Sequence, residues 1–160
     1  MKQKFTHLDE ANQPAMVDVG DKQITTRIAK ARSIVLLNEE ILNLLEGEEI
    51  NTKKGPVFQT AIIAGVMAAK KTSELIPLCH PIALDNCKVD IYINEQQEVV
   101  IDCIARTTGK TGVEMEALTG ANVAALTIYD MCKALSHHIV IKETRLMKKT
   151  GGKKDFEAEN

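Results

Sequence analysis

The chain has 160 residues, of which 44% are hydrophobic and 26% are charged, and its formal net charge is −2. This weak net charge excludes a strong general attraction to nucleic acid or to an acidic membrane. Aromatic residues make up only 3% of the chain, so it also lacks the stacking surfaces of a single-strand-binding protein. A chain of this length predicts one domain over residues 1–160, with flexible ends at about 1–15 and 148–160.

The first half of the chain predicts a strand followed by two helices. Residues 24–37 are rich in β-branched side chains, which favour a long strand. Asn38 can cap a helix over the next ten residues, EEILNLLEGE, and a polar turn is expected at 51–58. A second helix is predicted over about 57–74. Its many small residues indicate close packing against the sheet or against another subunit.

The second half predicts a hairpin, a long helix and a final strand. Residues 75–85 contain two prolines and cannot form a regular helix. Apolar and polar residues alternate over 88–107 on both sides of NEQQE, which predicts a β-hairpin. A helix over 115–136 and a strand over about 137–147 follow. This order predicts an α+β fold, with a mostly antiparallel sheet and helices packed on one face.

Lysines flank most of the glycine-containing turns, and this recurrence favours phosphate binding. Glycine lets backbone N–H groups converge on an anion, and lysine adds positive charge. For any single lysine, a solvated surface side chain is the simpler interpretation. The GKT at 109–111 is not a nucleotide-triphosphatase loop, because Ile104 stands where that loop requires glycine. The lysines at these turns are Lys53, Lys54, Lys110, Lys148, Lys149, Lys153 and Lys154.

Two groups of charged residues lie at the two ends of the predicted third helix. Glu114 and Glu116 share a face if the backbone there is extended, or form a helix start if it is helical. Asp130 and Lys133 are neighbours on a helix, either as a surface ion pair or as an acid/base couple. Glu116 and Asp130 are about 20 Å apart along such a helix, with an angular offset of about 40°. One site that uses both needs a substrate that spans them or a second subunit.

Other features of the sequence bear on metals and location. Cys79, His80 and Cys87 do not match a closed zinc spacing, so a turn with a hydrogen-bonded imidazole is the simpler interpretation and no metal is expected. The sequence shows no targeting signal, no membrane-length apolar run and no CxxC pair. These features predict a cytoplasmic protein with reduced thiols and no membrane partner.

Several longer motifs carry a resemblance to a known family. They are THLDE, MVDVGDK, KKGPVF, AAKKTSELIPLCHP, TGKTGVEMEAL, AALTIYDMCKA and KKTGGK. Over roughly residues 5–155 the chain resembles cyclic pyranopterin monophosphate synthase, the C component of the early molybdenum-cofactor pathway. The resemblance implies a ferredoxin-like α+β sandwich and a homohexamer, a trimer of dimers, with active sites at subunit interfaces.

The resemblance also implies a reaction and its site. The reaction is that of a lyase that converts 3′,8-cyclo-7,8-dihydroguanosine 5′-triphosphate to cyclic pyranopterin monophosphate and diphosphate. No cofactor is expected, and the presence of Mg²⁺ with the triphosphate is left open. Lys54, Glu114, Asp130 and Lys133 match the residues assigned to catalysis. The implied substrate-binding residues are Asp18, Lys22, Arg27, Lys70, Leu78, Cys79, His80, Met115, Glu116 and Lys149.

The departures from the family pattern touch none of the matched acids or bases. Pro56 replaces a usual Asp or Asn and is expected to stiffen the loop of Lys54. Gly120 replaces a common alanine, and TGGKKD replaces SGGKSG near the C-terminus. Two other classes stay open: a nucleotide-binding regulator without chemistry, and a metal-handling protein built on Cys79, His80 and Cys87.

Overall fold

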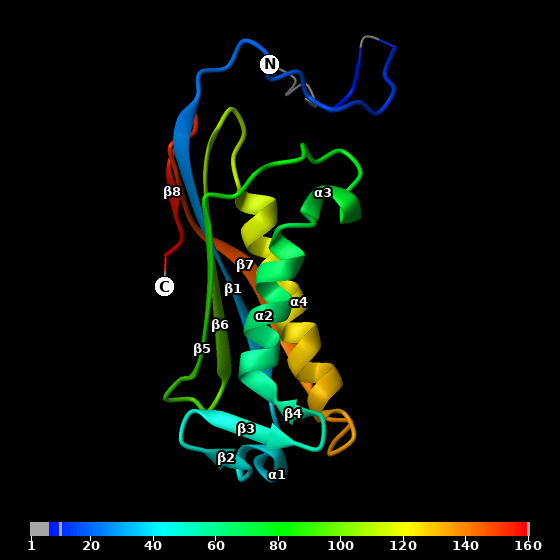
Figure 1. Ribbon diagram of the computed structural model, residues 1–160, viewed down its shortest axis with the longest axis vertical. Coiled ribbons are helices and arrows are strands. Elements are labelled where there is room, and N and C mark those ends of the chain that lie inside the picture. The colour runs from blue at the N-terminus through cyan, green and yellow to red at the C-terminus, as the bar shows by residue number, and fades with distance from the viewer. Residues whose placement is uncertain (1–6, 10, 160) are drawn as a thin grey trace.

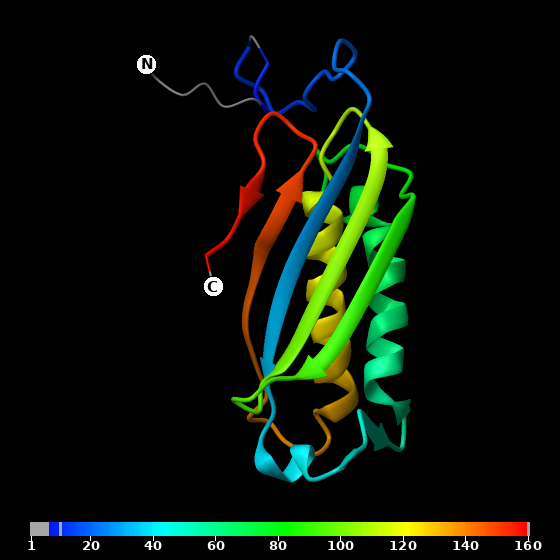
Figure 2. The ribbon, with the colours of Figure 1, turned by 90° about the vertical axis from the view of Figure 1, so that its left-hand side faces the viewer.

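A computed structural model describes residues 7–9 and 11–159 of the chain, in two layers (Figures 1 and 2). One layer is a five-stranded sheet in the order β5-β6-β1-β7-β8, in which all neighbours are antiparallel. The helices α2 and α4 cover one face of it (Figure 2). The main elements are β1 (Thr25–Leu36), α2 (Val57–Ala69), β5 (Asn86–Ile93), β6 (Val99–Gly109), α4 (Glu114–Cys132) and β7 (Val140–Thr150). This arrangement confirms the predicted α+β fold.

The central strand β1 separates the two faces of the sheet. Ala29, Ala31 and Val35 are buried on the face that the helices cover. Arg32, on the alternate face, donates hydrogen bonds of 2.7 and 2.9 Å to the carboxylate of Asp102 on β6. The period of two in this strand therefore places the apolar core under α2 and α4 and leaves charge pairing on the open face.

The two long helices cross at small residues. A Cβ at Gly65 of α2 would lie 2.9 Å from the backbone oxygen of Gly120 on α4 and 3.2 Å from Val89 of the sheet. Alanine at position 65 would overpack this crossing, at a cost of about 1–3 kcal/mol. The small residues predicted to permit close packing do so against both α4 and the sheet.

The segment after β1 differs from the prediction. The helix expected over ten residues is only α1 (Glu39–Leu42), because Gly47–Glu48 forms a two-residue turn that reverses the chain. The turn expected at 51–58 is the hairpin of two short strands. Three short strands make a second, small sheet at the end of the molecule, and they are β2 (Leu45–Glu46), β3 (Glu49–Thr52) and β4 (Gly55–Pro56).

The remaining elements largely follow the prediction. The helix expected over about 57–74 breaks at Lys70–Lys71 into α2 and a short α3 (Thr72–Leu75). The hairpin of β5 and β6 is confirmed, and α4 ends at Cys132 rather than residue 136. Strand structure also reaches into the C-terminal segment, where a flexible end was predicted. There β7 continues to Thr150 and pairs with β8 (Phe156–Glu157).

Candidate active site

Most of the predicted site residues lie in two clusters at opposite ends of α4. The N-terminal cluster surrounds Glu114, the first residue of the helix, and the C-terminal cluster surrounds Asp130 in its last turn. The helix rise separates Glu114 from Asp130 by about 24 Å. The N-terminal cluster contains Arg27, Leu78, Cys79, His80, Glu114, Met115, Glu116 and Lys149, and the C-terminal cluster contains Lys54, Asp130 and Lys133.

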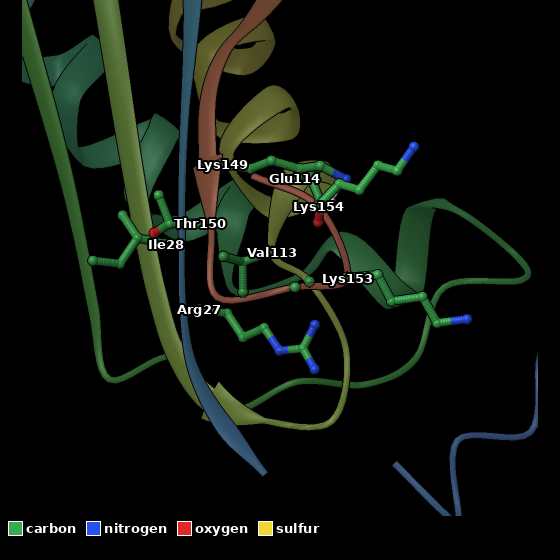
Figure 3. A pocket seen from close by; sticks show the side chains of 10 residues that line it. Arg27, Ile28, Val113, Glu114, Lys149, Thr150, Lys153 and Lys154 are labelled. Carbon is green, nitrogen blue, oxygen red and sulfur yellow. Dashed lines mark hydrogen bonds and ion pairs between the residues drawn. The ribbon is translucent and has the colours of Figure 1, made fainter. Parts of the chain in front are cut away.

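A cationic cavity of about 400 Å³ lies on one side of the N-terminal cluster. Figure 3 shows Arg27 of β1 and Lys149 of β7 with Glu114 at the start of α4. Lys149 Nζ lies 3.0 Å from Glu114 Oε1. Arg27 donates from Nη2 to the carbonyl of Lys110 at 3.2 Å, and within the described residues its buried Nε has no hydrogen-bond partner. A guanidinium with an unused donor therefore lines this cavity.

Two further lysines line this cavity, Lys153 and Lys154, and the resemblance assigned neither of them. The signal that could have found them is the pair of lysines that follows Gly151–Gly152 in the sequence. With Arg27 and Lys149, four cationic residues line a cavity that holds one carboxylate, which favours a multiply charged anion.

A second cavity of about 260 Å³ lies on the other side of Glu114. Burial, and then the charge of Glu114, raise the pKa of Glu116. Burial and the charge of Glu116 likewise raise the pKa of the Cys79 thiol. His80 Nε2 donates to the carbonyl of Val17 at 2.8 Å, which fixes the imidazole ring. The predicted binding residues that line this cavity are Leu78, Cys79, His80, Met115 and Glu116.

The residue at which α4 begins determines how Glu114 and Glu116 are oriented. Both lie in the first turn of the helix, so the extended arrangement with both carboxylates on one face is wrong. Glu114 points toward Lys149, whereas Glu116 is 3% exposed and lies by Cys79. A Cβ at Gly112 would overlap the carboxylate of Glu114, so this glycine leaves the space that the acid occupies. The two acids thus start the helix and line the cavities at once.

Three other predicted residues, Asp18, Lys22 and Lys70, lie outside the two N-terminal cavities. Asp18 accepts a hydrogen bond of 2.8 Å from the N–H of Gly20, and the ammonium of Lys110 donates to the Gly20 carbonyl. The backbone of Lys22 closes the same turn through the carbonyl of Val19 at 3.1 Å. Lys70 caps the C-terminus of α2 and is exposed. None of these three residues lines either N-terminal cavity.

The C-terminal cluster is a carboxylate held between two ammonium groups. Asp130 lies 2.7 Å from Lys133 Nζ and 2.9 Å from Lys54 Nζ. The side chains of Lys54, Lys133 and Asp130 are 51%, 54% and 54% exposed, so solvent screens this network. The hydrogen bond from Lys133, and then that from Lys54, lower the pKa of Asp130 to about 2. The same pair raises the pKa of Lys133.

Lys54 reaches Asp130 from a tight hairpin. Asn51 pairs with Pro56, and Thr52 pairs with Gly55, so Pro56 is part of the hairpin that presents Lys54. The Lys54 ammonium also donates to the backbone carbonyl of Asp130 at 3.1 Å. A cavity of about 480 Å³ lies beside this lysine and shares no lining residue with the two N-terminal cavities.

The alternative metal site was built on three residues that do not form one group, Cys79, His80 and Cys87. Among the described residues, no group of three His, Cys, Asp or Glu side chains is placed to hold a metal ion. His80 is bound to Val17, and Cys87 faces Cys103 instead, with 3.9 Å between the two sulfurs. In the same part of the chain, none of the helices combines the length and the apolar character needed to cross a membrane.

Comparison with known proteins identifies the family. A model described as "MoaC family" matches residues 16–152. The chain belongs to the MoaC family. This match spans every predicted site residue, whereas Lys153 and Lys154 lie just beyond it.

Individual MoaC-family relatives cover nearly the whole chain. The cyclic pyranopterin monophosphate synthase of Xanthomonas campestris is 51% identical over 155 residues, which are 97% of this chain and 94% of that protein. A molybdenum cofactor biosynthesis bifunctional protein of Synechocystis is 56% identical over 94% of this chain. Molybdenum cofactor biosynthesis protein 1 of Dictyostelium discoideum is 50% identical over 94% of it. The chain spans only 45% and 26% of the lengths of these last two relatives.

Proposed function

We propose that the chain is a cyclic pyranopterin monophosphate synthase in molybdenum cofactor biosynthesis. Its substrate is then (8S)-3′,8-cyclo-7,8-dihydroguanosine 5′-triphosphate, and its products are cyclic pyranopterin monophosphate and diphosphate. The observation that carries this proposal is the presence, at opposite ends of α4, of a cationic cavity and a separate Lys–Asp–Lys network. The first suits a triphosphate, and the second suits proton transfer to and from a ring that is rebuilt.

The N-terminal cluster binds the substrate in this proposal. Arg27 and Lys149 supply charge-assisted hydrogen bonds to phosphate oxygens, and a fixed cation also stabilises the diphosphate that leaves. Glu116 accepts N–H groups of the guanine-derived ring, because a carboxylate is an acceptor with two oxygens. Glu114 lines both cavities, so its carboxylate can contact the substrate where the ring is joined to the ribose.

The C-terminal cluster moves the protons. At neutral pH Asp130 is ionised, since its pKa is about 2, and the raised pKa of Lys133 keeps that ammonium protonated. Lys133 therefore starts as a proton donor, and it becomes a base only after it has given its proton away. Lys54 bonds to the other carboxylate oxygen and is placed for a second transfer.

Two protomers contribute to each site in this proposal. The cavities beside the two clusters share no lining residue, and the clusters lie at opposite ends of α4, so one protomer does not bring both to one reacting atom. A second chain that brings its C-terminal cluster to the N-terminal cluster of the first would complete the site. A homohexamer, built as a trimer of dimers, provides such interfaces by symmetry.

Mixing two inactive variants tests the shared site. Lys54→Ala damages the C-terminal cluster and Lys149→Ala damages the N-terminal cluster. If the subunits are exchanged at random, each shared site has about one chance in four of combining two intact clusters, so about a quarter of wild-type activity returns. A mixture that stays inactive, although mass spectrometry shows mixed oligomers, would contradict a shared site.

Turnover itself is tested with the purified protein and the cyclised nucleotide. We expect diphosphate and cyclic pyranopterin monophosphate in equal amounts, measured by a coupled diphosphate assay and by chromatography with mass detection. Binding without product would favour the nucleotide-binding regulator instead. No resident cofactor is proposed, and an assay in excess EDTA shows whether Mg²⁺ must accompany the triphosphate. We place the reaction in the cytoplasm, a location that the four free cysteines support.

A further inference from the structure

Two cysteines that take no part in the proposed reaction face each other across the hairpin of β5 and β6. Cys87 Sγ and Cys103 Sγ are 3.9 Å apart. Cys87 pairs with Ala105 and Cys103 pairs with Val89, so the two thiols are diagonal neighbours on the face that the helices cover. Both are free thiols.

The surroundings of the two thiols differ in a way that suits sequential chemistry. Cys103 is fully buried, and a Cβ on Gly120 of α4 would lie only 2.6 Å from its sulfur. Cys87 is only partly buried and is the second residue of β5. The hydrogen bond with Cys103, and then the charge of Lys70, lower the pKa of Cys87, whereas the same contact and burial raise the pKa of Cys103. Reagents from solvent therefore meet Cys87 first.

We propose that Cys87 and Cys103 form a modification site that small disulfides, such as glutathione disulfide, convert reversibly to an intramolecular disulfide. The Cys87 thiolate attacks one sulfur of the reagent, and the other sulfur leaves as a thiolate. Cys103 then loses its proton to that thiolate and attacks the Cys87 sulfur, which expels the second thiolate. The two protein thiols are oxidised by two electrons, and the reagent is reduced to two small thiols.

The sheet can accommodate this bond because β5 is an edge strand. The two sulfurs must approach from 3.9 Å to about 2 Å. Among residues 7–9 and 11–159, strand β5 has a strand neighbour only on its β6 side, and its first residues follow an irregular loop (Figure 2). A shift of this edge costs less than a shift of a central strand. Diagonal pairs are farther apart than most bridged cysteines, so we expect the bridge to be strained and readily reduced.

The bridge also affects the loop that enters β5. The Thr107 hydroxyl of β6 donates to the carbonyl of Ala83 at 2.7 Å, and the N–H of Asp85 donates to the backbone carbonyl of Arg106 at 2.8 Å. A shift of β5 along β6 strains these contacts. The same loop carries Leu78 and His80, which line a cavity of the N-terminal cluster.

The test is carried out on the Cys79→Ser variant, so that the tryptic peptide of residues 72–88 contains Cys87 alone. After incubation with glutathione disulfide, the titratable thiols should fall from three to one, and the intact mass should fall by about 2 Da. Trypsin should release residues 72–88 joined to residues 89–106, and dithiothreitol should reverse all three changes.

The matched control is the double variant Cys79→Ser with Cys87→Ser. Its two remaining thiols are both buried, so its thiol count should not change. Circular dichroism and thermal unfolding show that each variant is folded before the assay. A stable glutathione adduct on Cys87, an unchanged thiol count in the single variant, or a bridge to Cys132 would each overturn the proposal. None of these readouts needs catalytic activity, so they stand apart from the proposed reaction.

Discussion

The charged side chains at the two ends of α4 differ in their exposure to solvent. At the N-terminus Glu116 is 3% exposed and two cavities adjoin Glu114, so the site is already shaped within one chain. At the C-terminus the carboxylate and both ammonium groups of the Lys54–Asp130–Lys133 network are about half exposed. Exposed ion pairs have loosely held geometry, whereas a buried carboxylate must be fixed by its surroundings.

This difference indicates which end of α4 depends on substrate or a second chain to form a working site. In the free chain Lys133 holds its proton firmly, because the hydrogen bond and charge of Asp130 raise its pKa. Covering the cluster with substrate or a second chain removes water, strengthens the electrostatic coupling and moves these pKa values. The N-terminal cluster needs no such covering to be formed. The two ends should therefore respond differently to substitution, in rate, in binding and in stability.

The largest effect is expected at the C-terminal cluster, from Lys133→Ala. Loss of a positioned proton donor should lower kcat about 10²- to 10⁴-fold. The thermal unfolding midpoint should stay close to that of the wild type, because Lys133 is exposed. Steady-state kinetics and circular dichroism measure the two effects.

The matched control for that substitution is Lys88→Ala. Lys88 is also an exposed lysine paired with a carboxylate, Asp90 at 2.8 Å, but it lies on β5 outside both clusters. Its loss should leave kcat unchanged. Normal product formation by Lys133→Ala would remove this lysine from the proton-transfer step.

A smaller effect is expected at the N-terminal cluster, from Gly112→Ala. The new Cβ would overlap the Glu114 carboxylate and force it away from Lys149. The displaced carboxylate should lose one charge-assisted hydrogen bond in the substrate complex, and this loss should lower kcat/KM about tenfold. Gly109→Ala, at the end of β6, is the control, because the nearest atom to its Cβ would be 3.8 Å away. Equal kinetics for the two variants would show that the position of Glu114 is unimportant.

Much of the fold could be predicted from local pattern. The β-branched run of β1, the alternation in β5 and β6 and the long helix α4 were all expected close to their observed positions. The helix expected after Asn38 failed because the turn at Gly47–Glu48 outweighs the apolar spacing around it. The ends of α4 and β7 also shifted, since tertiary contacts decide where an element stops.

The candidate site was predictable only in part. Sequence spacing gave the Asp130–Lys133 pair, because neighbours on a helix are fixed by its geometry. It could not bring in Lys54, which reaches Asp130 from a hairpin 76 residues away. It also left the orientation of Glu114 and Glu116 open, since that depended on where the helix began. The sulfur contact of Cys87 with Cys103 required the register of β5 on β6.

The smallest effect expected is a gain in stability from Glu116→Gln. Burial raises the pKa of Glu116 above 4.5, so the ionised carboxylate destabilises the folded chain at neutral pH. The isosteric amide removes that charge. The unfolding midpoint of the variant should therefore exceed that of the wild type at pH 7, although substrate binding weakens. Wild type gains stability from this group as pH falls through the raised pKa toward 4.5, so the difference should narrow in thermal melts at lower pH.

The Asp130→Asn variant tests the C-terminal end of α4 in the same series of thermal melts. Its lysine partners lower the pKa of Asp130 from 3.8 to about 2. The ionised carboxylate therefore stabilises the folded chain above pH 3.8, and this stabilisation is lost as the pH falls through about 2. Because the cluster is exposed and screened, the midpoint at pH 7 should change little. A large loss of stability in Asp130→Asn, together with none of the expected gain in Glu116→Gln, would show that the two ends of α4 do not differ as described.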